Sequence, residues 1–176
     1  KYHLDGARLW NALVAKKQHP KQYGVLFDTI SVCFSKGLGA PIGSVLVSDA
    51  ETMHKALRIR KIFGGNMRQS GYLAAAGIFA LQNNIKRLED DHRRAKELGQ
   101  LLQQLPWVAN VSPTETNIVI FEVKKPLTEK QVIDTLKAKG ILISSMGQGK
   151  LRMVTHLDYK QVLHEYVLEN LGKVQF

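Results

Sequence analysis

The sequence predicts an α/β fold, because strand-like and helix-like patterns alternate along it. Stretches rich in β-branched and aromatic residues mark strands at residues 25–34, 44–47, 107–111, 117–123, 141–144 and 150–154. Between them, apolar residues recur at helical spacing over 8–16, 49–61, 70–105, 128–139 and 159–171. Such alternation is typical of α/β proteins.

Local signals set the limits of the first elements. A short strand ends at Leu4 and Asp5, and Leu9 and Leu13 then share one face of a helix. The β-branched run over 25–34 forms the next strand, and three glycines and a proline exclude a regular helix over 35–43. After the strand at 44–47, Asp49 is a candidate N-cap for the helix that follows.

The long helical pattern over 70–105 separates two parts of the chain. Ser70 is a candidate cap for its start, a break is expected at residues 82–84, and Pro106 ends it. We place residues 1–100 in a larger domain that includes this helix, and residues 101–176 in a small α/β domain. The first part has few strands for a sheet, so we expect part of its domain to precede residue 1.

Composition limits the function classes. The chain has 176 residues and a net charge of +10, but its Lys and Arg residues are spread out and match no nucleic-acid-binding motif. No run of about 18 apolar residues and no signal peptide is present. We therefore expect neither nucleic acid nor a membrane as a partner. The single cysteine, Cys33, is expected to be a small core residue in a cytoplasmic protein.

The first candidate for chemistry is Asp5-Gly6-Ala7-Arg8, which follows a strand. Binding crevices lie at the carboxyl ends of strands in open α/β sheets. Asp5 could face a protonated heterocycle there, and Arg8 could direct a cation into the same crevice. The alternative is that Asp5 only caps the following helix.

The second candidate is Lys36, which stands between a strand and the glycines of Gly37-Leu38-Gly39. A lysine held at a strand end, with small neighbours that let a cofactor approach the backbone, suits Schiff-base chemistry. The alternative is a surface lysine in a glycine turn.

Two arginines mark the remaining candidates. Arg68 lies in a glycine-containing loop that leads into a helix, where an anion could bind. Arg152 lies in a short apolar strand, which suits a charge only if a partner such as a substrate carboxylate meets it. The alternatives for Arg152 are an edge strand facing water or an acidic partner. His156 is interpreted as a structural residue, and no residue spacing indicates a metal.

Together these segments resemble the low-specificity threonine aldolases, fold-type-I enzymes that use pyridoxal 5′-phosphate (PLP). The resemblance is carried by HLDGARLWNA at 3–12, SKGLGAPIGS at 35–44, GGNMRQSG at 64–71, LAAAG at 73–77 and RMVTHL at 152–157. It implies the C-terminal half of a subunit. That half holds the second part of a mostly parallel large domain and a small C-terminal α/β domain.

The resemblance also implies a role for each matching residue. Lys36 resembles the lysine that carries the cofactor, Asp5 the carboxylate at the pyridine nitrogen, and Ala7 a residue against the ring. Arg8 resembles an arginine near the cofactor's phenolic oxygen and the substrate. The others are Arg68 for the cofactor phosphate across a subunit interface, Arg152 for the substrate carboxylate, and Lys61 near the site without a defined role.

The implied reaction is retro-aldol cleavage of threonine or allo-threonine, through a Schiff base, to glycine and acetaldehyde. The implied assembly is a homotetramer, and the family's phosphate loop and active-site histidines are expected upstream of residue 1. Two alternatives stay open. One is another fold-type-I PLP enzyme, an aminotransferase or a β-eliminating lyase, because fold does not fix reaction. The other is a fragment without enzymatic function.

Overall fold

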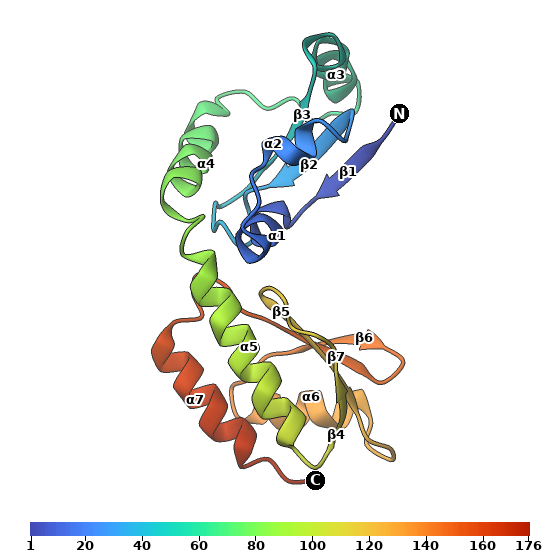
Figure 1. Ribbon diagram of the computed structural model, residues 1–176, viewed down its shortest axis with the longest axis vertical. Coiled ribbons are helices and arrows are strands. Elements are labelled where there is room, and N and C mark those ends of the chain that lie inside the picture. The colour runs from blue at the N-terminus through green and yellow to red at the C-terminus, as the bar shows by residue number, and fades with distance from the viewer. The chain divides into compact units, whose positions relative to one another are not determined.

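The computed structural model describes residues 1–176 and divides into two compact units, Lys1–Leu88 and Glu89–Phe176 (Figure 1). Each unit contains a sheet and helices, so the predicted α/β class is confirmed. The division falls at the start of a helix that the sequence analysis assigned to the larger domain. The reason is that this helix packs Ala95, Leu98 and Leu102 into the core of the second unit.

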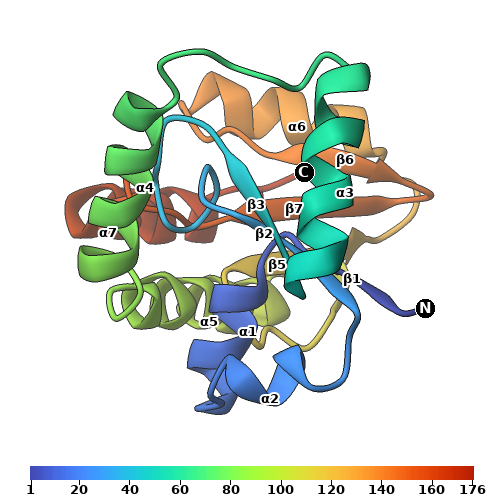
Figure 2. The same cartoon turned by 90° about the horizontal axis from the view of Figure 1, so that it is seen from above.

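The first unit is built on the sheet β1-β2-β3 (Figures 1 and 2). β1 pairs with β2 in parallel and β2 with β3 antiparallel, so the part of the sheet that this chain holds is mixed. β3 is an edge strand, and its Val45, Leu46 and Val47 are 41%, 39% and 51% exposed. The elements are β1 (His3–Gly6), α1 (Leu9–Lys16), α2 (Lys21–Gly24), β2 (Thr29–Cys33), β3 (Ser44–Ser48), α3 (Ala50–Ile62) and α4 (Gly71–Asn83).

Two small cores stabilise this unit. α1 packs Leu9 and Leu13 against Ile30 and Val32 of β2. The second core joins the loop after β2 to α4 and the residues that follow it, through Leu38, Ala40, Ala80 and Leu88. The loop after β2 is therefore fixed by buried side chains on both sides of its turn.

Local predictions in the first unit are confirmed in part. Asp49 caps α3, since its carboxylate accepts a hydrogen bond from the Thr52 amide at 2.8 Å. Ser70 makes no capping bond to α4, because its own backbone is already helical, with φ −62° and ψ −11°. The predicted strand at 25–34 begins only at Thr29, because residues 26–27 continue the turn that ends the short helix α2.

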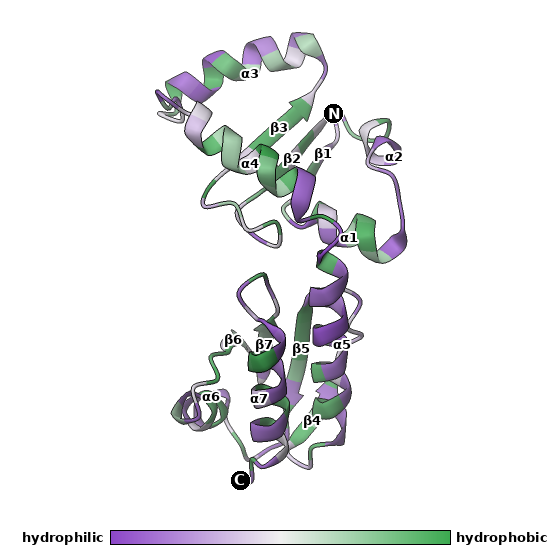
Figure 3. Cartoon of the chain, turned by 90° about the vertical axis from the view of Figure 1, so that its left-hand side faces the viewer, coloured by the Kyte–Doolittle hydropathy of each residue, from purple (hydrophilic) through white to green (hydrophobic).

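The second unit is an antiparallel sheet of order β4-β5-β7-β6. The elements are α5 (Leu88–Gln104), β4 (Val108–Val111), β5 (Ile118–Val123), α6 (Glu129–Ala138), β6 (Ser144–Gly147), β7 (Lys150–Val154) and α7 (Gln161–Gly172). All three helices contribute to one apolar cluster with the sheet. Figure 3 shows the green strands beside α5, whose outward turns are purple.

The predicted break between the two long helices is confirmed, since α4 ends at Asn83 and α5 begins at Leu88. The predicted strand at 141–144 is displaced toward the C-terminus. Ile141 is buried in the core without strand pairing, and pairing starts at Ser144. No helix of the structure has the length and apolarity needed to cross a membrane.

A buried histidine joins α5 and α7 of the second unit to the segment that follows β7. His164 of α7 is fully buried, and its Nε2 lies 2.6 Å from Glu97 Oε2 of α5. Its Nδ1 lies 3.1 Å from the hydroxyl of Tyr159. Arg93 also donates to Glu97, at 2.8 Å. Burial would raise the pKa of Glu97, but the hydrogen bonds from Arg93 and His164 outweigh it and lower that pKa.

We expect His164→Ala to destabilise the protein by about 2–4 kcal/mol, since it leaves a cavity and removes one hydrogen bond each from Glu97 and Tyr159. Urea unfolding of the full-length protein measures this. Because the pKa of Glu97 is lowered by folding, the stabilisation it contributes is present at neutral pH and is lost as the pH falls through the folded pKa. The exposed His156, replaced by Ala, is the control, and an equal loss in both variants would contradict the assignment.

Candidate active site

β1 and β2 bring the first two sequence candidates to one edge of the first sheet. The two strands are parallel, with Asp5 beside Ser31 and Gly6 beside Val32. Their carboxyl ends therefore lie together, and Lys36 follows β2 by three residues. Side chains alternate between the faces of a strand. Since Ile30 and Val32 pack against α1, the opposite face carries Asp5, Ser31 and Cys33.

Asp5 presents an accessible carboxylate at this edge. Its Oδ1 accepts a hydrogen bond from the amide of Ala7 at 3.1 Å, and the residue is exposed. The N-cap of α1 is Arg8, whose side chain makes no capping bond. The alternative that Asp5 caps α1 is therefore wrong. The side chain of Arg8 is half-buried at the beginning of the same helix.

Lys36 is exposed in a loop whose neighbouring residues are buried. Gly37, Leu38 and Ala40 are buried, while Lys36 is exposed. A hydrogen bond from the Gly39 amide to the Lys36 carbonyl, at 2.9 Å, closes the turn. The carbonyls of Gly37 and Leu38 accept hydrogen bonds from Arg87 at 2.9 Å and Asn84 at 2.7 Å. The backbone at Lys36 is therefore anchored while its side chain stays accessible.

The amine of Lys36 has one partner in this unit. Its Nζ lies 3.0 Å from Sγ of Cys33, which is half-buried. Cys33, expected from the sequence to be a core residue, is thus a neighbour of Lys36 instead. The alternation of β2 contained the signal, because Cys33 falls on the same face as Thr29 and Ser31, away from the apolar core.

Gly6 allows β1 to approach β2 at this edge. A Cβ at Gly6 would lie 2.6 Å from the carbonyl oxygen of Ser31, which is backbone and cannot move without shifting the strand. We expect Gly6→Ala to destabilise the protein by about 1–3 kcal/mol through this overlap. Thermal unfolding of the full-length protein checks it. Gly24→Ala is the matched control, since a Cβ there meets nothing within 4 Å. A Gly6→Ala variant as stable as the control would refute the overlap.

Arg68 and Lys61 lie on or beside the loop between α3 and α4, and both are exposed. The loop turns through Gly64, with φ +74°, and the Gly65 amide donates to the Arg60 carbonyl at 2.9 Å. Neither Arg68 nor Lys61 forms an ion pair within the chain. Both side chains are available to an anion or to another subunit, and their placement assigns no role by itself.

Arg152 occupies the middle of the second sheet. β7 lies between β5 and β6, so the alternative of an edge strand is wrong. Leu151 and Met153 point into the core, which places Arg152 on the opposite face. No carboxylate forms an ion pair with it; Ile120 lies opposite it on β5, and Glu122 pairs with Lys150 at 3.7 Å. Its Nε is buried without a hydrogen-bond partner. An unpaired, partly buried guanidinium is suited to a carboxylate that is not part of the chain.

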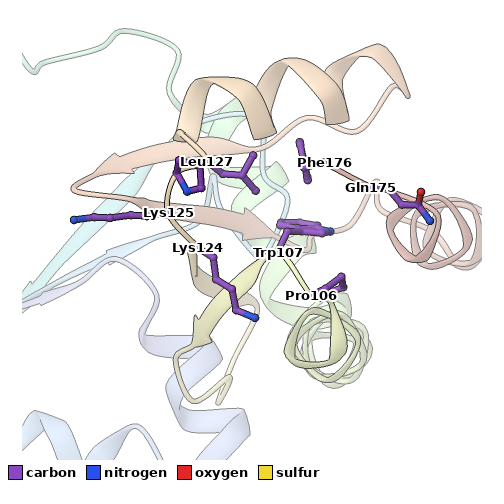
Figure 4. Close-up of a pocket in the computed structure, with 8 residues that line it drawn as sticks. Pro106, Trp107, Lys124, Lys125, Leu127, Gln175 and Phe176 are labelled. Carbon is purple, nitrogen blue, oxygen red and sulfur yellow. The ribbon is translucent and has the colours of Figure 1, made fainter.

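One pocket of the second unit is lined by other residues (Figure 4). Its walls come from the ends of α5, β5 and the C-terminal segment: Pro106, Trp107, Lys124, Lys125, Pro126, Leu127, Gln175 and Phe176. None of the predicted site residues lines it. This pocket is therefore not built from the candidate site residues at the strand edge of the first unit or from Arg152 of the second.

Known proteins similar to this chain indicate its family. The family model described as beta-eliminating lyase matches residues 1–126. A probable low-specificity L-threonine aldolase of Arabidopsis thaliana is 37% identical over 99% of this chain and 50% of its own length. The low specificity L-threonine aldolase of Escherichia coli K12 is 41% identical over 89% of this chain and 45% of its own length. The chain thus spans about half the length of these relatives.

Solved structures share the fold. A threonine aldolase of Leishmania major superposes with a TM-score of 0.74 at 18% identity, over 97% of this chain and 52% of that protein. The ornithine aminotransferase of Toxoplasma gondii, which has PLP at partial occupancy in its active site, reaches 0.66 at 17% identity over 97% and 42%. These structures establish the predicted fold class, and the family match and the sequence identities together show that the chain belongs to the beta-eliminating lyase family.

Proposed function

We propose that the full-length protein containing this chain is a PLP-dependent lyase that cleaves threonine and allo-threonine to glycine and acetaldehyde. The observation that carries the proposal is the shared edge of β1 and β2, which holds a carboxylate and an exposed lysine on anchored backbone. Its relatives named low-specificity L-threonine aldolases support the choice of reaction.

The donor set fits PLP. The cofactor needs an amine for its aldehyde, an anion for its protonated ring nitrogen and cations for its phosphate. Lys36 supplies the amine, Asp5 the anion, and Arg68 a cation, with Ala7 against the ring. When bound, PLP supplies an electron-accepting ring that stabilises negative charge at the substrate Cα.

The chain's own residues then orient the amino acid. Arg152 binds the α-carboxylate through its unpaired guanidinium, and Arg8 contributes a second cation from the start of α1. Fixing the carboxylate would set the rotation about the substrate Cα and so decide which of its bonds is placed to break. In this proposal Lys61 lies near the site and has no defined role.

We further propose a cytoplasmic homotetramer, in which Arg68 reaches the cofactor phosphate of a neighbouring subunit. Its exposure and its lack of an ion pair within the chain are compatible with that role. Light scattering of the full-length protein measures the assembly. A monomer that binds PLP would remove the role across the interface.

The deciding experiment uses the full-length protein with added PLP. We expect a visible absorbance band, a stable adduct after borohydride, and peptide mapping of that adduct to Lys36. Incubation with threonine and allo-threonine should release glycine and acetaldehyde in equal amounts. Transfer of the amino group to a keto acid would instead indicate the aminotransferase alternative. An adduct on another lysine, or none, would refute the proposal.

A further inference from the structure

We propose that Cys33 is a positioning residue for the amine of Lys36, an inference that rests on the function proposed for Lys36. Sγ of Cys33 lies 3.0 Å from Nζ of Lys36. No other side chain in the first unit makes a hydrogen bond or ion pair with this amine, although Asp5 lies on the same face of the sheet.

The amine needs such a contact because the lysine side chain is long and exposed. Its four-carbon stem samples many rotamers, and holding it in one costs conformational entropy. The backbone bonds of Gly37, Leu38 and Gly39 fix the main chain but leave the side chain free. A contact at the end of the side chain is what selects the direction of Nζ.

The place of Cys33 in β2 decides which direction that is. Ile30 and Val32 face α1, so Thr29, Ser31 and Cys33 face the other way, beside Asp5 of β1. A lysine amine held at Cys33 therefore lies over the sheet face that carries the carboxylate. The two groups expected to bind opposite ends of one planar cofactor are thereby kept on one side of the sheet.

The chemistry of the partner also matters. A carboxylate partner would favour the charged ammonium, which cannot attack an aldehyde. A thiol is a weak hydrogen-bond acceptor, so it orients the amine and releases it readily. The contact would hold the amine of Lys36 whenever that amine is not bonded to the cofactor.

Two substitutions separate positioning from simple filling of space. Cys33→Ser keeps an acceptor at this position, and Cys33→Val keeps an apolar side chain of similar size without the acceptor. Both are compatible with a half-buried position in a strand. Thermal unfolding of both variants shows whether they fold like the unaltered protein.

The test follows covalent attachment of PLP to the cofactor-free full-length protein, by absorbance and by mapping the reduced adduct. We expect Cys33→Val to slow attachment to Lys36 by about fivefold to tenfold, the effect of one modest hydrogen bond, and Cys33→Ser to remain within about twofold of the unaltered rate. In parallel, acetylation of Lys36 by a small acylating reagent, measured by mass spectrometry, should not slow in Cys33→Val, because that reaction needs no direction of approach.

Three results would overturn the inference. Attachment at the unaltered rate in Cys33→Val would show that the contact is dispensable. Equal slowing of attachment and acetylation would indicate a general change in the amine rather than its position. Slowing in Cys33→Ser as large as in Cys33→Val would mean that an acceptor is not what matters. If the unaltered protein forms no adduct on Lys36, the proposed function is wrong. The inference about Cys33, which rests on that function, is then wrong as well.

Discussion

Lys36→Ala should abolish the borohydride-stable adduct in the full-length protein and lower threonine cleavage by at least about a thousandfold, because the variant lacks the amine that attacks the cofactor's aldehyde. We expect the Lys36→Ala variant to fold like the unaltered protein. Lys36 is exposed and its loop is held by the hydrogen bonds of Gly37 and Leu38, which do not involve its side chain. Absorbance, adduct mapping and acetaldehyde release measure the three quantities.

Lys55→Ala is the matched control for Lys36. It removes another exposed lysine of the same unit, which pairs only with Glu51 on the surface of α3. We expect its spectrum and activity to match those of the unaltered protein. A cofactor adduct that survives in Lys36→Ala, on whatever lysine, would contradict the central assignment.

Arg152→Ala should weaken amino-acid binding by about 2–4 kcal/mol, roughly 30-fold to 700-fold in affinity, since it removes the cation that meets the carboxylate. The loss should fall mainly on KM or on the affinity for glycine, and binding of PLP should be preserved. A spectroscopic titration with glycine separates the two effects. Arg152→Lys should recover only part of the affinity, because an ammonium cannot bind a carboxylate in the two-pronged manner of a guanidinium.

Lys150→Ala is the control for Arg152. The two residues lie on one strand with their side chains on the same face, but Lys150 pairs with Glu122. Its removal should leave glycine affinity within about twofold, as for a surface ion pair. Equal losses in both variants would show that Arg152 acts only through the general charge of this face. Unchanged affinity in Arg152→Ala would remove it from the site.

The sequence was sufficient for most elements because their boundaries depend on local interactions. Asp49 caps α3 through a bond to Thr52, three residues away, and the polar stretch before Leu88 separates α4 from α5. Asp5 and Lys36 lie near one edge of the sheet because they stand at the ends of two adjacent parallel strands, β1 and β2. The resemblance to the family already implies that both residues bind the cofactor.

The features that could not be predicted from the sequence depend on contacts between segments or on backbone geometry. Ser70 is a favourable capping residue by type, but its backbone already adopts the helical conformation. The apolar residue Ile141 looks like part of a strand, although it is buried beside the sheet rather than paired in it. The contact of Cys33 with Lys36 depends on how the loop after β2 turns back, which Asn84 and Arg87 determine from far along the chain.

The edge strand β3 has a practical consequence for recombinant work on this protein. Unpaired backbone groups on a strand with exposed apolar side chains are a template for intermolecular pairing. Val45, Leu46 and Val47 provide such side chains on both faces of β3. Residues 1–88 produced alone are therefore expected to aggregate, and a charged residue in place of Val47 is the simplest way to keep that polypeptide in solution.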